Sequence, residues 1–236
     1  MLLSDKREEV LEYFKKYTEG KTLNELEIFF SEGEHHPIHK WLHYFDVYDR
    51  YFSKFRDREI LMVEVGVFKG GSLDLWKNYF GPKVKIIGVD IDPECKKFES
   101  DQIHIEIGSQ EDRNFWKDFR NRYPKADIFL DDGGHTMKQQ IVTFEEMYGH
   151  VANNGIYMCE DLHTSYWGDY QGGYRNPGSF IEYSKHFIDR MNAWYIGRNQ
   201  LPVDDFTKTA YSLAFYDSML VIEKKEREVP PVTLMI

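Results

Sequence analysis

Cysteine is scarce in this sequence, which has only Cys95 and Cys159 among its 236 residues. Both fall on or next to segments predicted to be strands, where a reduced and buried thiol is expected rather than a disulfide. No apolar run approaches the ~20 residues that a membrane-spanning helix needs, and no signal-peptide pattern is present. We therefore expect a cytoplasmic protein that has no membrane partner.

Positive charge is also in deficit. The chain has 30 Lys and Arg against 40 Asp and Glu, which gives a net charge of −10, and the two signs are interspersed. This balance argues against nonspecific binding to phosphates, so we expect no nucleic-acid partner. Hydrophobic residues make up 42% of the chain, which is enough for a large buried core.

The hydrophobic pattern divides the chain into two parts. Residues 1–58 lack a strand pattern, and their apolar residues recur at helical spacing. Within Lys40–Phe55 the aromatic residues recur at i, i+3, i+4 and i+7, which is typical of a helix face turned to the core. We expect 1–58 to form a helical cap, serving either as a lid or as an interface in a homo-oligomer, and 59–236 to form one compact domain.

From Glu59 onward, strand patterns alternate with helical ones. The predicted strands are Ile60–Val65, Lys83–Val89, His104–Ile107, Asp127–Leu130 and Gly155–Cys159. This order predicts an α/β fold whose mostly parallel sheet has helices on both faces. Ser212–Tyr216 and Met219–Glu223 flank a two-residue turn, which predicts a C-terminal antiparallel hairpin. Ligands of such sheets bind at the carboxyl ends of the strands.

Two predicted strands end in acidic residues. The stretch Ile128–His135 reads Ile-Phe-Leu-Asp-Asp-Gly-Gly-His, and Gly155–Cys159 is followed by Glu160 and Asp161. We expect these ends to share one pocket, where converging carboxylates would repel one another unless a divalent cation neutralised them. Oxygen ligands suit a hard ion such as Mg²⁺. The alternative, that the aspartates cap and charge a helix N-terminus, explains one of them but not the whole set.

A glycine-containing turn follows the first predicted strand. It runs Glu64-Val-Gly66-Val-Phe-Lys-Gly-Gly-Ser72, and Asp90 comes 24 residues after Gly66, at the end of the next strand. Glycine there lets a ligand approach the backbone, and an acid at this spacing pairs with a ribose diol in nucleotide-binding sheets. The glycines do not form G-x-G-x-x-G, which argues against a dinucleotide. A purely structural turn is the other interpretation.

The residues from Ile60 to Asp161 resemble a class I S-adenosylmethionine-dependent methyltransferase, whose sheet is Rossmann-like. Asp131-Asp-Gly-Gly-His135, together with the run from Glu160 to Trp167, is similar to the metal-dependent macrolide-sugar O-methyltransferases of the mycinamicin and macrocin group and to cephalosporin hydroxylase-like proteins. The resemblance covers roughly residues 36–225. It is specific at the acidic motifs and looser in the N-terminal cap.

The resemblance implies roles that are carried over position by position. Asp132, Glu160 and Asp161 correspond to magnesium ligands, and His135 corresponds to the general base that takes the proton of a sugar hydroxyl. The positions that bind S-adenosylmethionine are Glu64, Gly66, Ser72, Asp90, Ser109, Gln110 and Asp132, with Asp90 on the ribose and Ser109-Gln110 on the adenine. Asp131 has no assigned role: it either approaches the cofactor or braces the turn.

The implied function is Mg²⁺-assisted O-methylation of a hydroxyl on a sugar or glycosylated small molecule, as in antibiotic biosynthesis. Deprotonation of the hydroxyl is the main chemical demand on the protein. His163, Tyr166 and Trp167, with the loop through Pro177, either line the acceptor site or are incidental surface residues. Two other functions stay open: a nucleotide-cofactor oxidoreductase and a non-catalytic binding module. The sequence identifies neither the acceptor nor the pathway.

Overall fold

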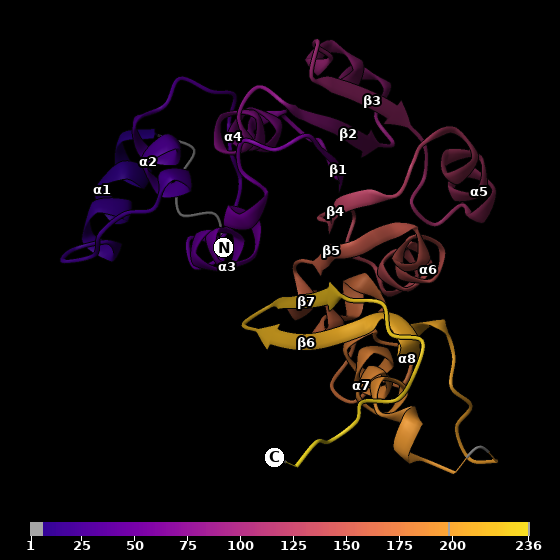
Figure 1. Ribbon diagram of the computed structural model, residues 1–236. Helices are drawn as coiled ribbons and strands as arrows, with labels where there is room; N and C mark the ends of the chain where they lie inside the picture. Colours follow the sequence, from indigo (N-terminus) through magenta and orange to yellow (C-terminus); the bar gives the residue numbers. More distant parts are fainter. Residues whose placement is uncertain (1–6, 198, 236) are drawn as a thin grey trace. The chain divides into compact units, whose positions relative to one another are not determined.

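A single sheet with strand order β3-β2-β1-β4-β5-β7-β6 runs through the computed structural model, which describes residues 7–197 and 199–235 (Figure 1). Neighbouring strands pair in parallel from β3 to β5 where their register is defined, and β7 is antiparallel to both β5 and β6. The predicted mostly parallel sheet with a C-terminal antiparallel hairpin is confirmed. The strands are β1 (Ile60–Val65), β2 (Val84–Asp90), β3 (Ile103–Ile107), β4 (Ala126–Asp131), β5 (Val151–Cys159), β6 (Ala210–Tyr216) and β7 (Met219–Lys224).

The chain forms two units. One comprises the chain up to Glu59 together with Val67–Val84, and the other comprises Ile60–Gly66 together with the chain from Lys85 onward. The predicted boundary at residue 58 stays a prediction, and residues 1–6 of the predicted cap lie outside the described residues.

The larger unit has its core between the sheet and four helices. Side chains from all four helices lie in one buried cluster with strand residues of β1, β2, β4, β5 and β7. Phe144 is central: it stacks on Phe187 at 4.3 Å between ring centroids and lies edge-on to Tyr157 at 5.4 Å. This packing fixes the helix that follows β4. The helices are α5 (Arg113–Arg122), α6 (Met137–Met147), α7 (Phe180–Met191) and α8 (Asp205–Thr209).

The smaller unit is an aromatic-rich helical cluster. Trp76 lies edge-on to Tyr48 at 5.0 Å and to Phe52 at 5.7 Å, and all three side chains are fully buried. The predicted core role of the aromatic residues at 44–52 is thus confirmed. The helices are α1 (Arg7–Tyr17), α2 (Glu25–Glu32), α3 (Tyr44–Phe52) and α4 (Gly71–Phe80).

The third of these helices begins later than predicted. The pattern gave Lys40–Phe55, but α3 starts at Tyr44, and Trp41 stands before it with 42% of its surface exposed. The preceding segment is held in a non-helical conformation against α4: the His36 backbone N–H and Nδ1 lie 3.0 Å and 2.7 Å from Asp74 Oδ2. The chain then continues without regular helix until α3 begins at Tyr44.

The start of α6 is fixed by a capping box. Thr136 is its N-cap, and the Thr136 and Gln139 side chains form reciprocal hydrogen bonds. The helix ends at Met147, and a short 3₁₀ turn leads into β5. The effect of the cap is to fix where the loop after β4 ends.

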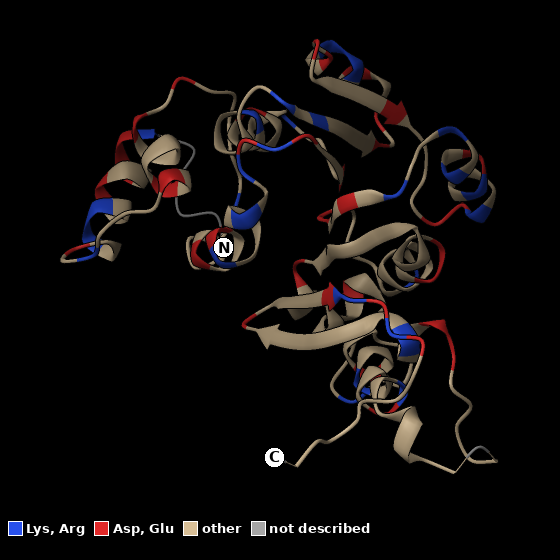
Figure 2. Cartoon of the chain, viewed as in Figure 1, with Lys and Arg blue, Asp and Glu red and all other residues tan. Residues whose placement is uncertain are grey.

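Basic and acidic residues both occur on most helices, whereas β5 and β6 contain neither (Figure 2). The absence of a nucleic-acid partner stays a prediction. In the part of the chain that the structure describes, every helix is too short or too polar to cross a bilayer.

Candidate active site

The two acidic strand ends lie side by side. β4 and β5 pair in parallel with Asp131 opposite Cys159, and the Glu160 N–H donates to the Asp131 carbonyl at 2.9 Å. On the other side of β4, the Asp132 N–H donates to the Val65 carbonyl of β1 at 3.0 Å. The strand pairing thus carries both acidic segments to the same edge of the sheet, as the sequence predicts.

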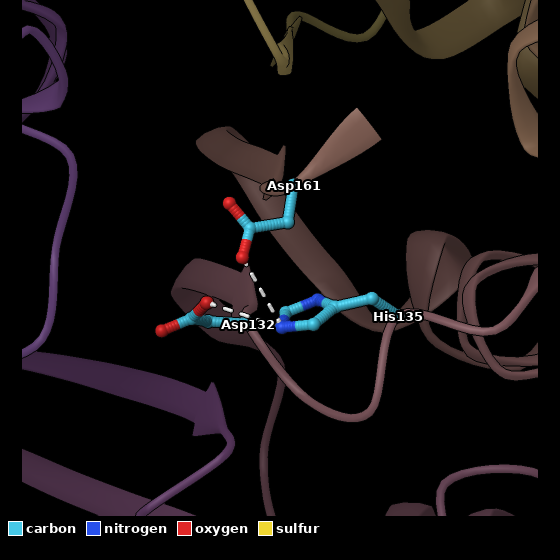
Figure 3. Close-up of side chains that lie close together, drawn as sticks. All are labelled: Asp132, His135 and Asp161. Atoms are coloured by element: carbon cyan, nitrogen blue, oxygen red, sulfur yellow. Dashed lines mark ion pairs between the residues drawn. The ribbon is translucent and has the colours of Figure 1, made fainter. Parts of the chain in front are cut away.

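Three side chains converge beyond these ends (Figure 3). His135 Nε2 lies 3.3 Å from Asp161 Oδ2 and 4.0 Å from Asp132 Oδ1. One donor atom from each residue lies within 4.8 Å of the other two, and all three side chains are partly buried. Two carboxylates and an imidazole at this spacing are a donor set that fits a divalent cation.

Unusual backbone conformations support this convergence. His135 and Asp161 have φ values of 58° and 56°, in the left-handed region of backbone conformation that residues other than glycine seldom occupy. The Thr164 hydroxyl lies 3.0 Å from the His135 carbonyl and 2.8 Å from the Asp161 carbonyl, so it links the two segments. Such strain costs about 1–3 kcal/mol per residue and is concentrated at functional sites.

Glu160, a predicted metal ligand, is not a member of the three-residue group. Its side chain is buried, with 1% of its surface exposed, and its backbone carbonyl accepts a hydrogen bond from the Gln140 side chain at 2.9 Å. Adjacent residues after a strand point in different directions, which separates Glu160 from Asp161. Its role as a ligand stays a prediction.

Asp131 points into the interior rather than toward the cluster. It is 1% exposed, and burial raises the pKa of its carboxyl to about 7, opposed by hydrogen bonds from the Gln110 side chain and the Gly133 backbone. The Gln110 amide donates to Asp131 Oδ1 at 3.0 Å. Of the two roles left open by the sequence, this position matches the bracing of the turn.

The predicted cofactor residues of the larger unit lie at, or just beyond, the carboxyl ends of adjacent strands. The Gly66 N–H donates to the Val89 carbonyl at 2.8 Å, and the Gly108 N–H donates to the Asp90 carbonyl at 2.9 Å. These bonds place Glu64-Val-Gly66, Asp90 and Ser109 at one edge of the sheet, the edge at which Asp132 lies. Ser72 lies in the first turn of α4, in the smaller unit.

A second histidine stands beside the cluster. His163 Nδ1 lies 2.5 Å from the Ser218 hydroxyl and 3.9 Å from Asp161 Oδ1, and burial lowers its pKa. Its ring is edge-on to Trp167 at 4.6 Å between centroids. Ser218 belongs to the β6–β7 turn, so the C-terminal hairpin contributes to the edge of this site.

Sequence reasoning missed Thr143, Thr164 and Ser218. Each is a hydroxyl residue that bonds to a site residue from a distant part of the chain. No local pattern marks such contacts, because only the fold brings the partners together. The capping pair Thr136 and Gln139, in contrast, has a recognisable spacing in the sequence.

Comparison with known proteins identifies sugar O-methyltransferases as homologues. The 8-demethyl-8-alpha-L-rhamnosyl tetracenomycin-C 2'-O-methyltransferase of Streptomyces olivaceus is 31% identical over 201 residues, covering 80% of this chain and 53% of that protein. Demethylmacrocin O-methyltransferase of Streptomyces fradiae is 31% identical over 205 residues, covering 78% and 50%. The chain therefore spans about half the length of these curated relatives. No family model matches the sequence.

Solved structures agree. MycE, a methyltransferase from the mycinamycin biosynthetic pathway, in complex with Mg and S-adenosylhomocysteine, superimposes with a TM-score of 0.77 at 26% identity, covering 97% of this chain and 64% of that one. The predicted Rossmann-like methyltransferase fold and the resemblance to the macrolide-sugar group are confirmed. The roles of individual site residues stay predictions.

We predict that Gly66→Ala displaces the backbone at Asp132 and destabilises the protein. Gly66 has φ +95°, and a Cβ there would lie 2.0 Å from the Asp132 carbonyl oxygen. Strain and overpacking should lower the free energy of unfolding by roughly 2–4 kcal/mol in urea denaturation. The control is Gly149→Ala, since a Cβ at that position meets nothing within 4 Å. Equal stability of the two variants would show that this contact does not constrain the loop.

Proposed function

We propose that this chain is an S-adenosylmethionine-dependent O-methyltransferase that uses Mg²⁺ and acts on a hydroxyl of a sugar or glycosylated natural product. The observation that carries the proposal is the convergence of Asp132, His135 and Asp161 at the carboxyl ends of β4 and β5. It occurs in a chain whose homologues are sugar O-methyltransferases.

The cofactor assignment rests on the fold and the donor set. The similar MycE structure contains Mg and S-adenosylhomocysteine, and the acidic group here has donors that suit the same ion. We assign the S-adenosylmethionine contacts to Glu64, Gly66, Asp90 and Ser109, with Asp90 on the ribose and Ser109 toward the adenine, and to Asp132 beside the ion. Ser72, in the other unit, stays a predicted contact.

The protein's part in the reaction is mainly to orient the acceptor and remove one proton. A bound divalent cation lowers the pKa of a hydroxyl held next to it, and S-adenosylmethionine supplies the methyl group. Asp132 and Asp161 would bind this cation through their carboxylates, with Glu160 as the third predicted ligand. His135 accepts the hydroxyl proton at Nε2, and Asp161 at 3.3 Å stabilises the imidazolium that results.

The position of His135 also allows a second role, that of a metal ligand instead of a base. Its Nε2 is close enough to both carboxylates to be a third ligand in place of Glu160. A hard ion such as Mg²⁺ prefers oxygen donors, which favours the role of a base for the imidazole. A homo-oligomeric state and a cytoplasmic location stay predictions.

Asp132→Asn should reduce methyl transfer strongly and lower cofactor affinity only slightly, because Glu64, Gly66, Asp90 and Ser109 keep their assigned cofactor contacts. The substitution keeps the side-chain shape but removes a charge that the cation needs, so turnover should fall by about 10²–10³-fold or more. Transfer from labelled S-adenosylmethionine to p-nitrophenyl α-L-rhamnoside measures turnover, and calorimetry with S-adenosylhomocysteine measures cofactor affinity. Excess EDTA should have the same effect on the wild type.

His135→Ala separates the two roles of the histidine when the transfer assay is combined with a measurement of Mn²⁺ affinity by electron paramagnetic resonance. If His135 is the base, turnover falls and Mn²⁺ affinity is unchanged, whereas if it is a ligand, Mn²⁺ affinity falls as well. Full activity of the Asp132 variant, or of the wild type in EDTA, would refute the metal-assisted mechanism.

The aromatic residues beside the cluster supply the acceptor contact in this proposal. Tyr166 and Trp167 are 51% and 49% exposed, and the Trp167 carbonyl accepts the Gly172 N–H at 2.9 Å, so the loop is held in place. Trp167 packs against His163, which lies next to Asp161. An exposed indole at this position can stack on the apolar face of a sugar ring whose hydroxyl reaches the cluster.

We predict that Trp167→Ala raises KM for the rhamnoside on the order of tenfold, because stacking on the ring is lost, with little change in kcat. Trp167→Phe should restore most of the affinity. Tyr211→Ala is the control, since Tyr211 is 54% exposed on β6. The acceptor role is wrong if both alanine variants have the same KM as the wild type.

A further inference from the structure

Gln110 spans the turn that carries the candidate metal ligand and base. Its side-chain oxygen accepts the Gly134 N–H at 2.7 Å, and its amide nitrogen donates to Asp131 Oδ1 at 3.0 Å. Asp131 directly precedes Asp132, and Gly134 directly precedes His135. One side chain thus bonds to the residue before each of these two groups.

Gln110 is itself held by residues of two helices, through its side chain and its backbone. Its nitrogen also donates to the Thr143 hydroxyl of α6 at 3.1 Å, and the Trp116 indole of α5 donates to the Gln110 backbone carbonyl at 2.8 Å. Only 6% of Gln110 is exposed. A buried, fully bonded amide of this kind holds one conformation of the chain that it contacts.

The turn is shaped to accept this amide. A Cβ at Gly133 would lie 1.9 Å from Gln110 Oε1, so the amide occupies the space that any larger residue would need. The orientation of the amide is fixed as well, because Gly134 offers a donor and Asp131 offers an acceptor. Asp131 and Thr143 accept both amide hydrogens, so the side chain has none left for an adenine ring.

We propose that Gln110 is a positioning residue for the metal site: by bridging Asp131 and Gly134 it fixes the turn from which Asp132 and His135 project. The inference rests on the proposed function, since it assumes that this turn binds the cation. It replaces the predicted adenine contact at Gln110, and it gives Asp131 the role of the partner that receives the bridge.

The test measures the affinities for Mn²⁺ and for S-adenosylhomocysteine separately. Gln110→Ala removes the bridge, so the Mn²⁺ dissociation constant measured by electron paramagnetic resonance should rise by about 10–100-fold, as is usual for groups that orient metal ligands. The affinity for S-adenosylhomocysteine, measured by calorimetry without metal, should stay unchanged. An adenine contact would give the opposite pattern.

A charge-swapped pair guards against simple misfolding. Gln110→Glu places a second carboxylate against Asp131 and should weaken Mn²⁺ binding. In the double variant with Asp131→Asn, the amide at 131 donates to the carboxylate at 110, so most of the Mn²⁺ affinity should be recovered. Tyr148→Phe is the control, because it removes a buried hydroxyl that lies 3.0 Å from Thr209 Oγ1, outside this network. It should reduce stability without changing Mn²⁺ affinity.

The possible outcomes separate the two proposals. If the wild type binds no Mn²⁺, the proposed metal site fails and this inference fails with it. If the wild type binds Mn²⁺ and both Gln110→Ala and Gln110→Glu bind it equally well, only the positioning role is overturned. Loss of S-adenosylhomocysteine affinity at constant Mn²⁺ affinity also overturns it and reinstates the adenine contact.

Discussion

The parallel pairing of β4 with β5 is the constraint on which the site depends. It sets Asp131 opposite Cys159, so the chain leaves both strands at the same level and the acidic residues that follow come together. The carboxylates of Asp132 and Asp161, whose oxygens lie within 4.8 Å of each other, repel one another. Packing elsewhere in the fold has to offset this repulsion. The aromatic core around Phe144 does so by fixing α6 against the two strands.

The site also depends on a polar layer behind it. Thr164 links the backbone at His135 to that at Asp161, and Gln110 bridges Asp131 and Gly134 in the turn after β4. The side chains of the cluster are partly exposed, whereas their supports are buried. This division lets the exposed groups change their contacts during a reaction while the backbone that carries them stays in place.

Much of this arrangement could be predicted from the sequence. Alternating strand and helix patterns gave the sheet, and acidic residues directly after two strands gave the location of the site, since the carboxyl ends of parallel strands share an edge. The direction of each side chain could not be predicted. The left-handed backbone at His135 and Asp161 turns those residues toward each other, and no spacing rule foretells it.

The contacts of Gln110 could not be predicted from the sequence either. Its position after β3 suggested a cofactor contact by resemblance, yet its side chain is used by Asp131, Thr143 and Gly134, which come from later parts of the chain. Such contacts exist only in the folded protein. Likewise, the pairing of His163 with Ser218 requires the C-terminal hairpin to lie beside β5.

The central claim is that Asp132 and Asp161 bind a divalent cation at the edge of the sheet. The most direct measurement is anomalous diffraction at the manganese edge from crystals grown with Mn²⁺ and S-adenosylhomocysteine. We expect one strong peak within about 2.0–2.3 Å of carboxylate oxygens of both residues. A crystal that contains S-adenosylhomocysteine but has no peak there, or has its peak at other residues, would contradict it.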